Sequence, residues 1–312
     1  MSRRRHLHCL ALGTLVCVLA AGCGRQQPQS RHGGRSYEST RVPGFPVTVT
    51  DALGNRVTLQ QPPQRIVSLA PNTTEILFAL GLGRRVVGVS DDSNYPPAAA
   101  NKPKLGGVAV PSLERIIALS PDLAVGNRLN PRAMLEKLRA SHIPVYAADP
   151  QTVEQVLDNI QAIGRLTGTT PRAQRLVRDL RAQVRQIRSA QPKGKRPSVL
   201  FLLSDQPPWV AGRETFVDDL IRLAGGRNVA NDVQGFAPLS LEAIALRNPE
   251  VILVGMMVPA ADAVRRVRRL PGLSTTTGAR QGKIYALNPD LVLRPGPRVV
   301  EGLSEMAEVM NR

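Results

Sequence analysis

The fold is decided by a phrase that occurs twice in the chain. Residues 112–125 read SLERIIALSPDLAV, and residues 240–253 read SLEAIALRNPEVIL. In both copies Ser-Leu-Glu opens a helical stretch, and a short apolar run that is typical of a buried strand follows. The copies lie much further apart than the period of a solenoid repeat. We therefore predict two lobes of one architecture with a cleft between them, and Glu114 and Glu242 at equivalent points of the lobes.

The first residues of the chain indicate export. Arg3, Arg4 and Arg5 precede an apolar run, Leu7 to Ala21, that is too short to span a bilayer comfortably as a mature helix. The run ends in LAAGC at Cys23, which resembles a bacterial lipobox, where the chain is cut before the cysteine and its sulfur receives a lipid. We predict a lipoprotein signal peptide over residues 1–22 and a lipid anchor on Cys23. The alternative is an ordinary signal peptide with a cysteine near its end.

Cysteine usage agrees with the lipobox. The three cysteines are Cys9, Cys17 and Cys23, so the mature chain would keep only the lipid-bearing one and rely on its core instead of disulfides. Residues 23–45 are polar and lack periodicity, which predicts a flexible tether. We expect a protein that is lipid-anchored to the cell membrane, faces the periplasm or the cell exterior, and does not span the bilayer.

The chain is strongly basic, with a formal net charge of +17 that comes mainly from arginine. It lacks a recognition motif for nucleic acid, so we do not expect nucleic acid as a partner. The densest basic cluster is Arg265-Arg266-Val267-Arg268-Arg269. It is interpreted as the solvated face of a helix, and the alternative is attraction to anionic lipid headgroups.

Residues 46–168 are predicted to form an α/β lobe. Residues 47–59 alternate and turn like a hairpin, and Arg65 to Ala70 forms a short apolar strand. Pro71 then opens a helix for which Asn72 or Thr73 is the expected cap, with Glu75 in the first turn. Further strands are expected at 86–90, 123–125 and 144–148, with helices between them. This alternation predicts a parallel sheet that is covered on both faces.

A long helix and a second lobe follow. The apolar spacing from Leu176 to Ile187, with Pro171 near its start and Pro192 beyond its end, predicts a bridging helix within residues 169–192. At 1.5 Å per residue, about 20 residues span about 30 Å, which is enough to join two lobes and to limit their opening. Residues 193–312 restart with a strand at Ser198 and end with a helix from Val299 to Met310. The predicted fold is α/β, with two Rossmann-like lobes on mainly parallel sheets.

The region 46–312 resembles a known family, the helical-backbone (class III) substrate-binding proteins of ABC importers, which capture corrinoids, ferric siderophores and haem. The likeness is closest to the cobalamin (vitamin B12) receptors. It rests on the order and spacing of several short phrases, each of them weak alone. They are RIVSLAP with Thr74-Glu75, VGVS at 87–90, NYPP at 94–97, the two Ser-Leu-Glu phrases, the strand entries at Pro121 and Pro249, and RPGPR at 294–298.

The resemblance implies roles for the paired glutamates. In that family one glutamate on each lobe docks onto arginines of the permease dimer, which works with its ATPase subunits, and Glu114 and Glu242 match those positions. Two carboxylates on a stiff frame can engage a two-fold-symmetric partner through bidentate arginine pairs. The alternative is that each carboxylate only complements the positive end of its helix. The receptor itself is expected to act as a monomer.

A macrocyclic small molecule is the expected ligand, held between the lobes where loops leave the strand ends. Cobalamin or a related corrinoid fits the resemblance best, since a corrin ring presents apolar faces rimmed by amides and suits aromatic walls with neutral donors. The alternatives are a ferric siderophore, for which arginines would supply positive charge, and haem. The candidate ligand-binding residues are Asp92, Tyr95, Gly106, Asn127, Arg128, Trp209, Phe236 and Arg294.

An enzyme is the rival class, and the sequence does not favour it. We find no nucleophile elbow, phosphate loop or metal-binding histidine pair. Beyond the signal peptide the histidines are His32 and His142, one in the tether and one in a lobe, so a zinc or manganese receptor is not expected. The protein is predicted to carry no cofactor of its own.

Overall fold

The N-terminal lobe is built on a parallel sheet. Its four strands lie in the order β4 (Val86–Val89), β3 (Ile66–Ser68), β7 (Leu123–Asn127) and β8 (Val145–Ala148). Ile66 packs into one core cluster and its neighbour Val67 into another, because successive side chains of a strand point to opposite faces. Helices α1 (Pro71–Ala79) and α5 (Val153–Leu166) cover the first face, and α3 (Leu113–Ala118) and α4 (Arg132–Ala140) cover the second.

The C-terminal lobe repeats this plan with a mixed sheet. Strands β9 (Ser198–Asp205), β13 (Val251–Val254) and β14 (Ile284–Ala286) are parallel, and β11 (Arg227–Asn228) pairs with β9. Strand β10 (Pro208–Ala211) pairs antiparallel with β9, and β12 (Phe236–Pro238) pairs antiparallel with β10 at the edge of the sheet. Helices α7 (Phe216–Leu223) and α12 (Val299–Met310) pack on one face, and α8 (Leu241–Arg247) and α9 (Ala260–Arg268) on the other.

The computed structural model describes residues 42–312 except 193 and 195, and residues 41–312 form one compact unit. The expected signal peptide, Cys23 and residues 23–41 of the expected tether lie outside the described residues. Phe45, the last residue of that tether, already packs against the core. The smaller elements are β1 (Val47–Thr50), β2 (Arg56–Leu59), α2 (Pro97–Ala100), β5 (Gly106–Gly107), β6 (Val110–Pro111), a 3-10 turn (Leu273–Thr275), α10 (Thr277–Arg280) and α11 (Pro289–Val292).

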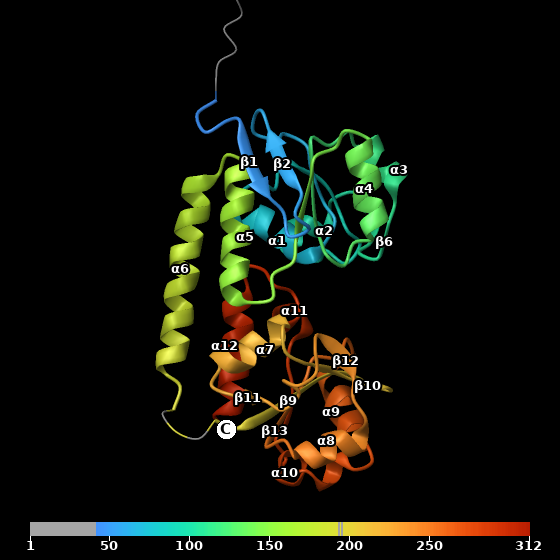
Figure 1. Ribbon diagram of the computed structural model, residues 1–312, viewed down its shortest axis with the longest axis vertical. Helices are drawn as coiled ribbons and strands as arrows, with labels where there is room; N and C mark the ends of the chain where they lie inside the picture. Colours follow the sequence, from blue (N-terminus) through green and yellow to red (C-terminus); the bar gives the residue numbers. More distant parts are fainter. Residues whose placement is uncertain (1–41, 193, 195) are drawn as a thin grey trace, which may run out of the picture. The chain divides into compact units, whose positions relative to one another are not determined.

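Helix α6 (Thr170–Ser189) joins the two lobes. It runs alongside both of them (Figure 1) and contacts α5 of the N-terminal lobe and α12 of the C-terminal lobe. Its buried residues are Ala173, Val177, Leu180 and Val184, and they belong to a single apolar cluster that contains side chains of both lobes. The predicted fold of two α/β lobes and a long interlobe helix is therefore confirmed.

The start of α1 differs from the prediction. The helix begins at Pro71 with Ala70 as its N-cap, so Asn72 and Thr73 lie inside it and neither is the cap. Proline is favoured at the first helical position because its missing N–H would have no partner there, and this moves the start forward. Glu75 is consequently beyond the first turn and buried. The serines of the repeated phrase do act as caps, since Ser112 Oγ accepts from the Arg115 N–H and Ser240 Oγ accepts from the Ala243 N–H.

Gly164 allows the close contact between α5 and α6. A Cβ atom on Gly164 would lie 2.4 Å from the Ala173 Cβ, which no real contact permits. We expect Gly164→Val to lower the free energy of unfolding by about 2 kcal/mol, because over-packing a tight interface forces the helices apart. Guanidinium denaturation followed by circular dichroism measures the change.

The matched control is Gly194→Val. Gly194 is exposed and a Cβ atom there would meet nothing within 4 Å, so its effect should stay within about 0.5 kcal/mol. Equal midpoints for the two variants would contradict the proposed role of the α5–α6 contact.

Candidate functional site

A cleft lies between the lobes at the carboxyl ends of the parallel strands, where open α/β sheets bind ligands. It encloses about 1130 Å³ of empty space, part of it open to solvent. On the N-terminal side it is lined by residues 71–72, 92, 108, 127–129 and 148–151, and on the C-terminal side by residues 214–217, 235–236, 257 and 293–295. The loops that follow β3, β4, β7 and β8 thus face segments of the other lobe. A concave site that is lined from both lobes in this way suits a small-molecule ligand.

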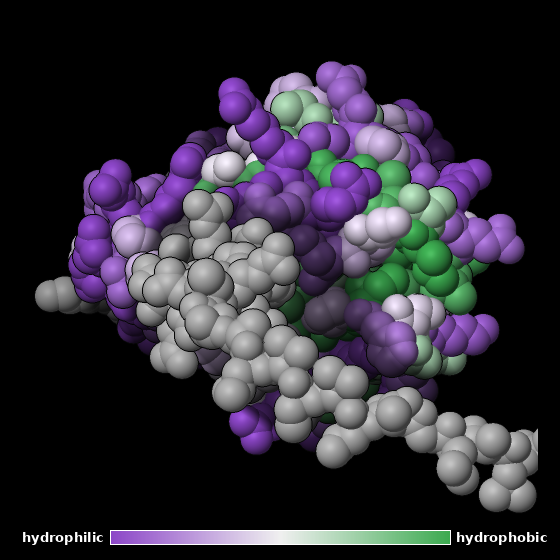
Figure 2. Space-filling model, turned by 90° about the horizontal axis from the view of Figure 1, so that it is seen from above, coloured by the Kyte–Doolittle hydropathy of each residue, from purple (hydrophilic) through white to green (hydrophobic). Residues whose placement is uncertain are grey.

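Large apolar side chains are exposed to solvent along this cleft. Leu129 is 68% exposed, Met257 is 73% exposed and Phe236 is 39% exposed, and all three line the cavity. Exposed apolar groups gathered in a concave site mark a place where an apolar ligand surface is buried. Figure 2 looks onto the N-terminal lobe from above, and on that face hydrophilic residues (purple) predominate, with apolar residues (green) between them.

The two arginines of the cleft are held by carboxylates. Arg128 Nε lies 3.0 Å from Asp149 Oδ1, and Arg294 Nη2 lies 2.8 Å from Asp290 Oδ1. Arg294 Nη1 also donates to Asn94 Oδ1 at 2.6 Å. Asp92 and Glu214 add two further acidic groups to the lining. The cleft is therefore not a site of unopposed positive charge.

Asparagine side chains brace the N-terminal side of the cleft. Asn130 is buried, its Oδ1 accepts from the Asn127 N–H at 2.8 Å, and its Nδ2 donates to the carbonyls of Leu69 and Val108. Asn127 Nδ2 in turn donates to Asn72 Oδ1 at 3.1 Å. Asn72 Nδ2 is buried and has no hydrogen-bond partner among the described residues. A buried donor without a partner costs about 1–3 kcal/mol.

Five of the eight predicted ligand-binding residues line the cleft, and three do not. Asp92, Asn127, Arg128, Phe236 and Arg294 belong to the lining. Tyr95, Gly106 and Trp209 do not belong to it, for a separate reason in each case.

Backbone pairing and a neighbouring arginine explain these three positions. The Tyr95 ring lies under the Arg298 guanidinium, 4.1 Å from its carbon to the ring centre. Gly106 is in β5, where it pairs with Pro111 at a φ of 96° that favours glycine. Trp209 is in β10, which pairs with β9 on one side and with β12 on the other.

Several lining residues are not among the eight predicted from the sequence. Met257 follows β13, and residues 148–151 comprise the last residue of β8 and the three after it, so the rule that ligands gather at the carboxyl ends of parallel strands points to both. Residues 214–217 follow the antiparallel strand β10, to which that rule does not apply. Asn72, for which the sequence predicts only a role as helix cap, also lines the cleft.

Glu114 and Glu242 lie outside the cleft. Each is exposed in the first turn of its helix, α3 or α8. Hydrogen bonds from its own backbone N–H and from the Ser240 side chain hold the pKa of Glu242 below its usual value, so it stays ionised. Helices α3 and α8 lie on the side of the molecule away from α6 (Figure 1). Both carboxylates are therefore free to meet a partner from outside.

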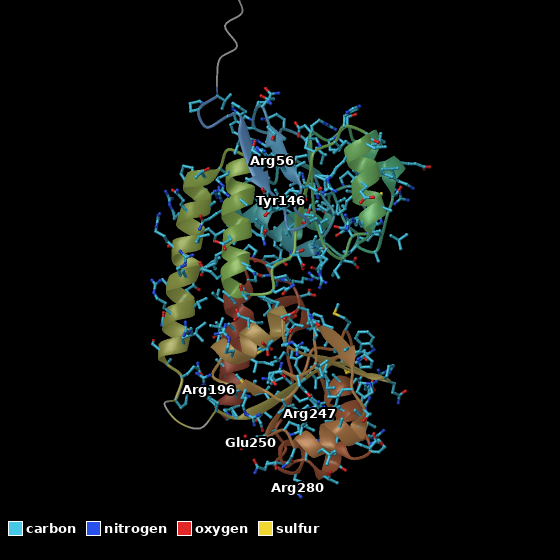
Figure 3. All side chains as sticks on the ribbon, viewed as in Figure 1. Arg56, Tyr146, Arg196, Arg247, Glu250 and Arg280 are labelled. Carbon is cyan, nitrogen blue, oxygen red and sulfur yellow. The ribbon has the colours of Figure 1, made fainter. Side chains whose placement is uncertain are left out.

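Other polar clusters stabilise the lobes away from the cleft. Tyr146 donates to Asn159 Oδ1 at 2.5 Å, and burial raises the pKa of its phenol. Arg247 pairs with Asp232 at 2.7 Å in the C-terminal lobe, and Glu250 accepts from the Ser198 N–H at 2.8 Å. Figure 3 shows Tyr146 in the N-terminal lobe and Arg247 and Glu250 in the C-terminal lobe.

The part of the chain that the structure describes contains neither a metal-binding cluster nor a membrane-spanning helix. No group of three or more His, Cys, Asp or Glu side chains is placed to hold a metal ion in this part of the chain. Across the same residues, no helix combines the length and apolar character needed to cross a membrane.

The chain belongs to the periplasmic binding protein family, whose sequence profile matches residues 66–291. It is a substrate-binding protein of an ABC importer, a class of protein that works with a permease and an ATPase. The prediction that the chain is no enzyme is confirmed, because the relatives described next are binding proteins for transport.

Relatives and a solved structure cover most of the chain. It is 32% identical over 302 residues to an uncharacterized ABC transporter substrate-binding lipoprotein, YvrC, of Bacillus subtilis, covering 94% of this chain and 93% of that one. It is 30% identical to a cobalamin-binding protein of Halobacterium salinarum, covering 100% of this chain and 86% of that one. The structure of the periplasmic haem-binding protein RhuT from Roseiflexus sp. RS-1 is 34% identical, with a TM-score of 0.71, and the match covers 79% of this chain and 97% of that one.

We expect Asn130→Ala to lower the free energy of unfolding by about 2–3 kcal/mol, because it leaves the Leu69 and Val108 carbonyls and the Asn127 N–H without their partner. Urea denaturation of the ligand-free protein measures this. Asn311→Ala is the control, since Asn311 is exposed and its amide makes one hydrogen bond, to Gln191. An Asn130 variant no less stable than the Asn311 variant would contradict the bracing role.

Proposed function

We propose that this protein is a lipid-anchored receptor that captures cobalamin or a related corrinoid in the interlobe cleft and delivers it to the permease. The observation that carries the proposal is the combination of exposed apolar walls with arginines that are already paired to carboxylates. Such a cleft suits a broad, weakly charged macrocycle. The cobalamin-binding relative agrees with this choice.

The apolar walls match the faces of a corrin ring. Leu129 belongs to the N-terminal lobe, whereas Phe236 and Met257 belong to the C-terminal lobe, so the ligand would be held from both sides. Asn72 and Asn127 line the same cleft, and their neutral amides are of the type that would suit the carboxamides at the rim of the ring.

An anionic ferric siderophore is the second candidate, and the charge balance argues against it. Arg128 and Arg294 would have to exchange Asp149 and Asp290 for the ligand, while Asp92 and Glu214 would repel it. Haem fits less well for another reason. Its iron takes axial ligands such as His, Tyr, Cys or Met, and among the described lining residues only Met257 is of these types.

Anchoring and docking complete the proposal. Cys23 would carry the lipid, in line with the lipoprotein relative, and the receptor would act as a monomer. Glu114 and Glu242 would each bind an arginine of the permease dimer, since both carboxylates are exposed and Glu242 remains ionised.

The ligand assignment is tested by incubating the purified protein with aquocobalamin, desalting it and recording the visible spectrum. We expect a coloured complex of one-to-one stoichiometry. Phe236→Ala should weaken binding about tenfold or more, because the loss of a buried aromatic contact costs about 1.5–3 kcal/mol.

Trp209→Ala is the matched control, since Trp209 is similarly exposed but lies outside the cleft lining. It should leave the affinity for cobalamin unchanged. A colourless protein after desalting that instead retains a ferric siderophore or haem would overturn the corrinoid assignment.

Docking is tested by the double variant Glu114→Ala with Glu242→Ala. Removal of both carboxylates should abolish cobalamin uptake by cells and leave the binding affinity of the isolated receptor intact. The control is Glu136→Ala with Glu308→Ala, which removes two other exposed carboxylates, from α4 and α12. Lost affinity in the first double variant, or equal uptake by both, would refute the docking role.

A further inference from the structure

A buried ion pair joins the two lobes beside the cleft. Glu75, on α1 of the N-terminal lobe, has a side chain that is only 2% exposed. Arg298, just before α12 of the C-terminal lobe, donates from Nε to Glu75 Oε2 at 2.9 Å and from Nη2 to Glu75 Oε1 at 2.6 Å. Two parallel hydrogen bonds of this kind fix direction as well as distance.

A second arginine extends the contact across the lobes. Arg294 Nη1 lies 4.0 Å from Glu75 Oε1, and the same guanidinium binds Asn94 Oδ1 and the Asp92 carbonyl in the loop after β4. Asn94 Nδ2 donates in turn to Asp290 Oδ2 at 3.0 Å. The network therefore connects α1 and the 92–95 loop of one lobe with residues 290–298 of the other.

The backbone of the C-terminal segment also comes close to α1. A Cβ atom on Gly296 would lie 3.5 Å from the Asn72 carbonyl oxygen and 3.6 Å from Glu75 Oε2. The Arg298 guanidinium lies over the Tyr95 ring, 4.1 Å from its centre. Arg298 is thus held between a buried carboxylate and an aromatic face, a setting in which a guanidinium is favoured over an ammonium.

We propose that Glu75 is a positioning residue that clamps the segment Arg294–Arg298 to the N-terminal lobe and so sets the spacing of the two lobes. Glu75 is not among the residues that line the cleft, whereas Asp92 and Arg294 of the same network are. Glu75 acts on the ligand through them. The same clamp fixes how far α3 lies from α8, a consequence for delivery that rests on the proposed function.

The test measures lobe spacing without any ligand. The chain from residue 24 onward has no cysteine and contains the compact unit 41–312, so Arg132→Cys on α4 and Leu246→Cys on α8 give two exposed sites for spin labels. Electron–electron double resonance then reports the distance distribution between the lobes. Glu75→Gln should broaden that distribution about twofold, because it removes the charge that holds both arginines.

Two further variants separate the clamp from general loss of stability. Arg298→Lys keeps the charge but cannot make two parallel bonds, so it should give an intermediate width and remains informative if Glu75→Gln folds poorly. Glu154→Gln is the matched control, because it breaks the exposed pair of Glu154 with Arg181 and should leave the width unchanged. If the folded Glu75 and Arg298 variants gave distance distributions as narrow as that of the parent protein, the proposal would be overturned.

A ligand measurement completes the design. Glu75→Gln should weaken the affinity for cobalamin about tenfold although Glu75 does not line the cleft. Rescue to an intermediate affinity in Glu75→Asp, which restores the charge, would support positioning, whereas parent affinity in Glu75→Gln would contradict it. If the parent protein binds no corrinoid, the proposed function fails while the distance measurement still decides the clamp.

Discussion

The structure depends on one apolar core that continues from lobe to lobe along α6. Val177, Leu180 and Val184 on this helix belong to the same cluster as Ile163 of the N-terminal lobe and Leu303 of the C-terminal lobe. To swing the lobes widely apart, the chain would have to expose part of this core, at about 25 cal/mol for each Å² of apolar surface. The cleft is therefore largely formed before a ligand enters, and its loops stand on sheets that cannot move far.

The buried ion pair and the apolar core have different effects. A buried salt bridge contributes little net stability, since desolvation offsets much of its attraction, yet the loss of one partner leaves an uncompensated charge and costs about 3–5 kcal/mol. Glu75 with Arg298 therefore selects one arrangement of the lobes, and the cluster around α6 supplies the stability. Helix α6 limits the motion of the two lobes on one side of the molecule, while the ion pair fixes the distance between the lobes beside the cleft.

The sequence predicted what depends on periodicity and capping, and missed what depends on contacts between distant residues. The long helix followed from the spacing of Val177, Leu180 and Val184, and the helices of the repeated phrase followed from their serine caps. The cap of α1 was wrong because Pro71 itself starts the helix. The pairing of Arg294 with Asp290 and Asn94 could not be read, because residue types do not tell which charges are already neutralised. The place of Trp209 depends on the pairing of β10 with β9 and β12, which the residues of β10 alone do not reveal.

A stiff frame has a consequence for how such a receptor meets its permease. In the docking proposed above, two carboxylates would bind a two-fold-symmetric pair of arginine sites best at a constant separation, because each degree of freedom lost on docking weakens the complex. Glu114 and Glu242 stand on helices of separate lobes, so their separation is only as well defined as the lobe spacing. The shared core and the Glu75 contact both constrain that spacing. Asp92 and Arg294 belong both to the lining of the cleft and to the interlobe contact, so a ligand that touches them also touches the link between the lobes.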